Sequence, residues 1–181
     1  MRHIRVLEHA NFLASIGCQH VIITELTGHS KKEFEVSTAP DPNGHSHRDS
    51  TTWLTTRGKA RYSADRLLRI FINNFGVDVV NHRMTAANLI SLYTTYMAIY
   101  PNDEMSINRI YYFFKRLASR EFVISYCSEK RCKKPFISKN VRDKQCMTCT
   151  TLHKIRKNAV KNSSESDLEQ LDLPEAMTAV A

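Results

Sequence analysis

Apolar residues recur with helical spacing through most of the first 120 residues of the chain. Between Leu7 and Ala39 the spacing is near 3.6 residues, which predicts a helical stretch interrupted at Gly28. Ser30 follows as a capping residue for a second short helix, with Glu33 in the third position of a capping box. A helix, a glycine turn and a capped helix form the outline of a helix-turn-helix, although a plain helical hairpin has the same pattern.

Three further segments also carry an apolar stripe at helical spacing. Ala60–Phe75 places apolar side chains on one side and arginines on the other. Thr85 is positioned to cap a helix over Ala86–Tyr100, and Ser106 to cap one that begins at Ile107. The aromatic residues of this last helix fall on its apolar stripe, so we interpret them as core residues and not as a nucleobase-stacking surface.

The period changes after residue 120. Glu121–Tyr126 alternates, and Lys133–Asn140 is a second predicted strand with a proline near its start. Residues 162–181 are acidic and poor in aromatics, which predicts disorder. We expect a mainly α fold: a helical domain over 1–120 that carries the helix-turn-helix-like segment and oligomerisation, a zinc-ribbon-like β-hairpin module over 121–161, and an acidic tail.

Four of the five cysteines follow the spacing C-x4-C-x13-C-x2-C, namely Cys127, Cys132, Cys146 and Cys149. Two such knuckles joined by a hairpin set four thiolates in the tetrahedron that zinc prefers, and four protein ligands leave no open position for water. The spacing therefore predicts one structural Zn²⁺ per chain. Two disulfides, or a site in which His153 replaces one cysteine, are the alternatives. Cys18 lies among apolar helix residues and is interpreted as a buried thiol.

Positive charge is concentrated around these cysteines. The net charge is +8, yet residues 115–161 carry 14 Lys or Arg and 3 Asp or Glu, while residues 162–181 carry 5 acids and no base. Such a block attracts a polyanion, which is usually nucleic acid and less often a membrane surface, unless it is only a solvated face. The candidate phosphate contacts are Lys130, Arg131, Lys133, Lys134, Lys139, Arg142, Lys144, Lys154, Arg156 and Lys157. For reading bases, the candidates are His29, Lys31 and Lys32 on the predicted second helix, or Arg142.

Other features exclude several classes of protein. No apolar run approaches the roughly 18 residues of a membrane span, and no signal peptide follows Met1–Arg5, so we expect a cytoplasmic protein without a membrane partner. The chain has no phosphate-binding glycine loop and no HExxH motif, so we expect no enzyme. His45 and His47 are interpreted as exposed loop residues, and Asp78 with His82 as a helix-surface pair.

Residues 109–152, which run from the last helix through both cysteine knuckles, resemble the C-terminal half of the FlhC family, the larger subunit of the bacterial flagellar master activator. Residues 13–36 occupy the place of that family's helix-turn-helix-like segment. Residues 50–56, with Trp53, resemble its Trp-containing stretch after a Pro/Gly-rich loop. In all, the resemblance covers about residues 7–153.

The resemblance implies a transcriptional activator that contacts double-stranded DNA and places RNA polymerase at a promoter. It also implies a hetero-oligomer with a small helical FlhD-like subunit, and zinc bound by the four cysteines. The first knuckle is longer than in flagellar members, which favours the FlhC-like activators of conjugative plasmids or integrative elements. A zinc-thiolate redox sensor or chaperone and a zinc-ribbon RNA-binding protein are the alternatives from the residues alone.

Overall fold

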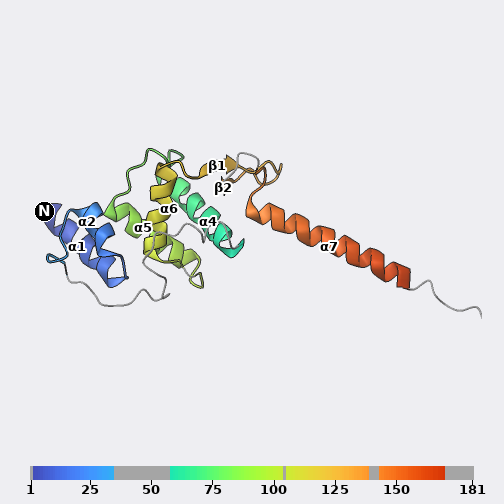
Figure 1. Ribbon diagram of the computed structural model, residues 1–181, viewed down its shortest axis with the longest axis horizontal. Helices are drawn as coiled ribbons and strands as arrows, with labels where there is room; N and C mark the ends of the chain where they lie inside the picture. Colours follow the sequence, from blue (N-terminus) through green and yellow to red (C-terminus); the bar gives the residue numbers. More distant parts are fainter. Residues whose placement is uncertain (1, 35–57, 104, 139–142, 170–181) are drawn as a thin grey trace, which may run out of the picture. The chain divides into compact units, whose positions relative to one another are not determined.

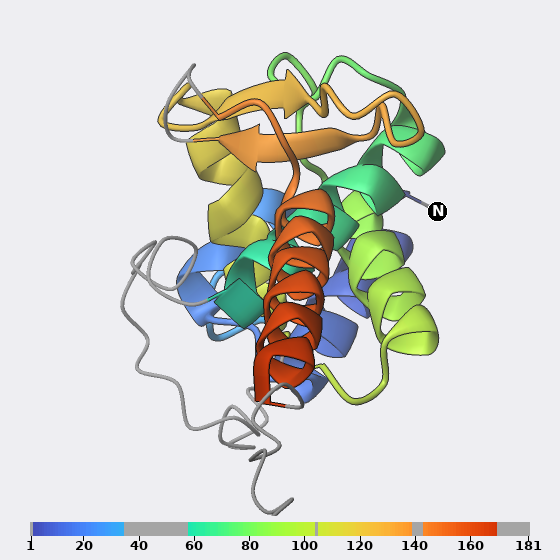
Figure 2. The ribbon, with the colours of Figure 1, turned by 90° about the vertical axis from the view of Figure 1, so that its right-hand side faces the viewer.

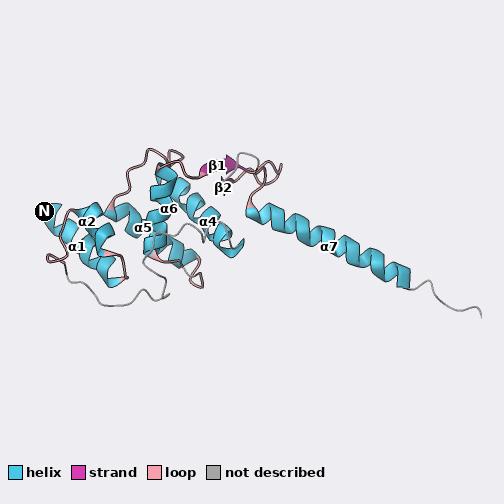
Figure 3. Cartoon of the chain, in the orientation of Figure 1, coloured by secondary structure: helices cyan, strands magenta, loops and turns pink. Residues whose placement is uncertain are grey.

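The computed structural model describes residues 2–34, 58–103, 105–138 and 143–169. It is mainly helical, with one small antiparallel hairpin beside a cysteine cluster, which confirms the predicted fold class (Figures 1 and 3). The elements in chain order are α1 Arg2–Ser15, α2 His20–Thr27, α4 Gly58–Phe75, α5 Ala86–Ile99, α6 Ile107–Ala118, β1 Val123–Tyr126, β2 Pro135–Ser138 and α7 Met147–Glu169. No described helix is both long and apolar enough to cross a membrane.

The chain divides into two units, residues 1–147 and 148–181. The first contains the helical core and the hairpin, whose strands run side by side in opposite directions (Figure 2). The described part of the second unit is α7 beyond its first residue.

The N-terminal helical stretch breaks earlier than the sequence predicted. The stretch between Leu7 and Gly28 is not one helix, because α1 ends at Ser15 and Gly17 adopts a left-handed φ of 79°. The buried Asn108 of α6 stabilises this turn: its amide donates to the Gly17 carbonyl at 3.0 Å, and its oxygen accepts from the Gln19 amide at 2.8 Å. α2 then ends at the predicted glycine, since Gly28 caps it with φ of 76°.

The predicted second helix does not begin at Ser30. Residues 31–33 form a turn, in which the Glu33 amide donates to the Ser30 carbonyl at 2.9 Å. One half of the predicted capping box is present, because the Glu33 carboxylate accepts from the Ser30 amide at 2.6 Å. The rest of that predicted helix, and the loop that contains His45 and His47, lie outside the described residues.

The three central helices match their predictions. Thr85 caps α5 by accepting from the Asn88 amide, and Ser106 caps α6 by accepting from the Arg109 amide. The apolar stripe of α6 is buried in the core together with residues of α1, α2, α4 and α5, which confirms the interpretation of its aromatics. The buried residues of this stripe are Ile107, Ile110, Tyr111, Phe114 and Leu117.

Helix α7 was not predicted. The sequence predicted a basic module up to residue 161 and disorder from residue 162, whereas residues 147–169 form one continuous helix. Once the first turn exists, each further residue adds a hydrogen bond without a new nucleation cost, so a polar segment can extend a helix that it would not start. Residues 170–181 lie outside the described part.

Candidate metal centre

The hairpin positions the first cysteine pair. β1 and β2 pair in antiparallel register with Ile124 opposite Ile137, so both predicted strands are present in shorter form. Cys127 directly follows β1, and its amide donates to the Lys134 carbonyl at 3.0 Å. Cys132 lies in the connecting turn, where its amide donates to the Glu129 carbonyl at 2.9 Å. The pair therefore occupies the tight connection between the strands.

The second pair comes from the segment that starts α7. Cys146 immediately precedes the helix and Cys149 lies in its first turn. The Ser128 amide donates to the Lys144 carbonyl at 2.8 Å, and the Cys146 amide donates to Cys127 Sγ at 3.4 Å. These two bonds join the two cysteine knuckles.

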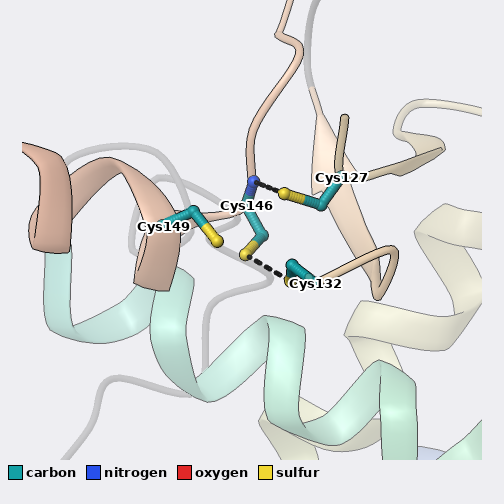
Figure 4. Close-up of side chains that lie close together, drawn as sticks. All are labelled: Cys127, Cys132, Cys146 and Cys149. Carbon is teal, nitrogen blue, oxygen red and sulfur yellow. Dashed lines mark hydrogen bonds between the residues drawn. The ribbon is translucent and has the colours of Figure 1, made fainter. Parts of the chain in front are cut away.

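All four sulfurs converge on one point (Figure 4). Their Sγ atoms lie within 4.8 Å of one another, and Cys132 Sγ is 3.7 Å from Cys146 Sγ. A zinc tetrahedron with Zn–S distances of about 2.3 Å requires sulfurs about 3.8 Å apart, so the observed spacing fits the ion. Cys127, Cys146 and Cys149 are buried and Cys132 is partly exposed. The four cysteines could therefore hold one metal ion.

The positions of the sulfur atoms distinguish the four-cysteine site from its two alternatives, a pair of disulfides and a site that includes His153. None of the five cysteines forms a disulfide, and the 3.7 Å between Cys132 Sγ and Cys146 Sγ is far longer than the ~2.05 Å of a disulfide bond. Among the described residues, the group that could hold a metal consists of the four cysteines and does not include His153. Cys18 is buried as predicted, and burial raises the pKa of its thiol to about 12.

Helix α4 holds the hairpin from the side opposite β1. The Ile137 amide of β2 donates to Asp65 Oδ1 at 3.0 Å, and Arg69 Nε donates to the Pro135 carbonyl at 3.3 Å. Asp65 and Arg69 are one helical turn apart, and they bond the outward backbone groups of β2 as a neighbouring strand would. Phe136, at the centre of β2, is fully buried.

A second link joins α4 to the segment between β2 and the second cysteine pair. Asp143 Oδ2 accepts from Ser138 Oγ at 3.0 Å and from Arg61 at 3.4 Å. The Tyr62 hydroxyl donates to the Met147 carbonyl at 3.4 Å, next to Cys146 in the chain. The helical core therefore contacts the metal-binding segment just before its second knuckle, at Asp143, and within that knuckle, at Met147.

Asp65 is a buried acid near the site, and it was not among the residues selected from the sequence. It is buried, and burial raises the pKa of its carboxyl group, against the opposing effects of the Ile137 hydrogen bond and the Arg69 charge. The sequence held one indication of its burial, because this acid directly follows Ala64, which is part of the apolar stripe of a predicted helix. Its partner on β2 is 72 residues away, which no local pattern indicates.

The structure places most of the predicted DNA contacts on the surface. Eight of these cations are exposed: Lys130, Arg131, Lys133, Lys134, Lys144, Lys154, Arg156 and Lys157. Lys139 and Arg142 lie outside the described residues. Lys31 and Lys32 are exposed on a turn instead of a helix, and His29 lies 3.5 Å from the Glu33 carboxylate.

Asp78 and His82 do not form the predicted helix-surface pair, because both lie in the connection between α4 and α5. Asp78 accepts hydrogen bonds from Asn81. The His82 ring packs against Phe71, and its Nε2 atom lies 2.7 Å from Nδ2 of the Asn88 side chain. Each residue therefore has a local structural role.

No protein-family model matches the chain, and no curated protein matches it.

Proposed function

We propose that this chain is a zinc-containing, DNA-binding subunit of a bacterial transcription activator. The proposal depends on one observation: four cysteine sulfurs lie at the distances that zinc requires, within the basic segment 121–161. Every cation of that segment whose side chain the structure describes is exposed. The sequence resemblance to the FlhC family supports the same function. It adds an FlhD-like small helical subunit and RNA polymerase as partners, and conjugative-transfer promoters as the favoured targets over flagellar ones.

The zinc ion would have a structural role in this function. The hairpin has two strands of four residues, which is too little to be stable alone. A metal held by the two knuckles supplies the missing folding free energy. The neighbouring cations Lys130, Lys133 and Lys144 would offset the net charge of −2 on a zinc ion with four thiolates. The zinc would therefore let cationic side chains keep fixed positions.

Duplex DNA is the polyanion that this arrangement suits best. Exposed lysines and arginines on a rigid support neutralise phosphates and release their counterions. If six phosphates are neutralised, the logarithm of the affinity should fall with the logarithm of the salt concentration at a slope of roughly −5. Contacts of this kind set affinity and register, whereas reading of sequence requires side chains in a groove.

The test is a gel-shift titration with the full chain, alone and with its partner subunit, over a range of salt concentrations. The gene for the partner subunit is expected next to the gene for this chain, as a short reading frame that encodes a helical protein. The proposal predicts a salt-sensitive complex with duplex DNA that strengthens when the partner is present. Preference for structured RNA over duplex DNA would favour the RNA-binding alternative. Reversible zinc release by mild peroxide, together with a change in activity, would favour the redox sensor.

A further inference from the structure

Helix α7 is exposed on all sides from residue 154 to residue 159, where the description of its side chains ends. Every residue from Lys154 to Ala159 is exposed. The sequence from residue 144 to residue 164 contains five Lys or Arg and no acid. Cys149 lies in the first turn, so a metal bound there would hold the start of this helix against fraying.

The cations of α7 do not all share one face. Successive residues of an α-helix are rotated by about 100°. Lys157 and Asn158 then lie about 60° and about 40° to either side of Lys154, which makes one polar face. Arg156 lies about 160° from Lys154, on the side of Leu152 and Ile155.

We infer that α7 enters the major groove of duplex DNA with the face formed by Lys154, Lys157 and Asn158. This inference rests on the proposed function and adds the element that reads sequence. The major groove accommodates an α-helix, and an Asn amide is the side chain that pairs with adenine through two hydrogen bonds. On this face Lys154 and Lys157 contact phosphates, and Asn158, about 40° beyond Lys154 on the side away from Lys157, reads a base.

The structure favours α7 over the segments selected from the sequence. Lys31 and Lys32 lie on a turn and not on one of the described helices. α7 extends from Met147 to Glu169, which is longer than the groove contact of one helix requires. Its Lys154, Lys157 and Asn158 are exposed together on one face.

An anionic membrane is the competing partner for a basic helix. A helix that lies in a membrane surface needs a broad apolar face rich in Trp, Phe or Leu. On the described part of α7, the large apolar residues with high exposure are Leu152 and Ile155, at 48% and 58%. Two such residues make a narrow apolar face, so the cationic face points to DNA.

Arg156 was a candidate phosphate contact on sequence alone, but its position about 160° from Lys154 takes it out of the contact face and makes it a matched control within the same helix. It has the same charge as Lys154 and Lys157, is two residues from the first and one from the second, and is also exposed. A nonspecific electrostatic role would make the three cations equivalent. A groove contact through one face makes Lys154 and Lys157 more important than Arg156.

The experiment uses the full zinc-loaded chain with its partner subunit. The wild-type complex first selects duplexes from a random library, and the best sequence and a scrambled duplex then serve as probes. The variants are the double substitution Lys154→Ala/Lys157→Ala, Asn158→Ala and the control Arg156→Ala. Zinc content and circular dichroism verify that each variant is folded.

The double variant should weaken binding to both duplexes and reduce the salt slope by about 1.8, because two phosphates lose their partners. Asn158→Ala should lower the preference for the selected sequence by roughly 5- to 100-fold, while binding to the scrambled duplex stays unchanged. Arg156→Ala should leave the affinity for both duplexes within about twofold of wild type.

Three results would overturn the inference while leaving the proposed function intact. Arg156→Ala could weaken binding as much as the double variant, or Asn158→Ala could leave the sequence preference unchanged. The double variant could also lose binding to phosphatidylserine vesicles and keep its affinity for DNA. A wild-type complex that binds no duplex would overturn the proposed function and this inference together.

Discussion

Replacing Asp65 tests how the helical core holds the metal-binding hairpin. In Asp65→Ala, the buried Ile137 amide loses its acceptor, and a buried unsatisfied donor costs about 1–3 kcal/mol. Asp65→Asn removes the charge and keeps one side-chain oxygen to accept from the Ile137 amide, while its NH2 group replaces the second oxygen. We therefore expect Asp65→Ala to lower the free energy of unfolding by about 2 kcal/mol, which corresponds to roughly 4–8 °C in melting temperature. Asp65→Asn should cost less than half of that.

The pKa of Asp65 explains why loss of the charge should be tolerated. Burial raises this pKa, so the folded protein disfavours the ionised carboxylate relative to the unfolded chain. The folded state binds the proton more tightly, and stability falls as the pH rises through the window between the unfolded and the folded pKa. Asp65→Asn has no group that titrates there. Its stability relative to wild type should therefore improve as the pH rises through that window.

The assay is urea unfolding of the zinc-loaded chain, followed by circular dichroism, with the rate of zinc transfer to a colorimetric chelator as a second readout. Asp65→Ala should release zinc faster, because β2 loses a link to α4. The control is Asp78→Ala, an exposed acid with local bonds to Asn81, which should change stability by less than about 1 kcal/mol. Equal stabilities of Asp65→Ala and Asp65→Asn would refute the role assigned to the acceptor.

Three further predictions concern the cysteine cluster, the turn at Gly17 and the buried Cys18. Cys146→Ser should abolish stoichiometric zinc binding and unfold the hairpin while the helical core stays folded, as seen by metal analysis and NMR amide dispersion; retained zinc would contradict the ligand set. Asn108→Ala should cost about 1–3 kcal/mol in urea unfolding, because the Gly17 carbonyl and the Gln19 amide lose their partner; an unchanged midpoint would contradict it. After zinc is removed with a chelator, iodoacetamide should modify four cysteines quickly and Cys18 only after denaturation, as counted by mass spectrometry, because burial raises the Cys18 pKa to about 12; rapid fivefold labelling would contradict it.

Local patterns predicted the parts of the fold that local physics determines. The stripe that starts at Ile107 and the caps at Thr85 and Ser106 are in place, because side-chain periodicity and end-capping act within a few residues. The cysteine spacing likewise predicted the four sulfurs that the structure brings together, since the two short knuckles need only a hairpin between them.

Effects from outside a segment's own sequence account for what the sequence did not predict. The break at Gly17 depends on Asn108, which is 91 residues away, and periodicity alone placed the break at Gly28. The bond from Ile137 to Asp65 spans 72 residues. The helix through residues 162–169 continues from a turn that starts at Met147, whereas the composition of that segment alone predicts disorder.

The proposed function depends on one zinc ion that the four cysteines hold and that stabilises the cationic hairpin. Elemental analysis of the chain, purified under reducing conditions without chelator, tests it most directly. We predict one zinc per chain in the wild type and none in a variant with Cys127 and Cys146 both replaced by serine. A wild-type chain that is folded yet carries no zinc, or a double variant that keeps it, would contradict the account.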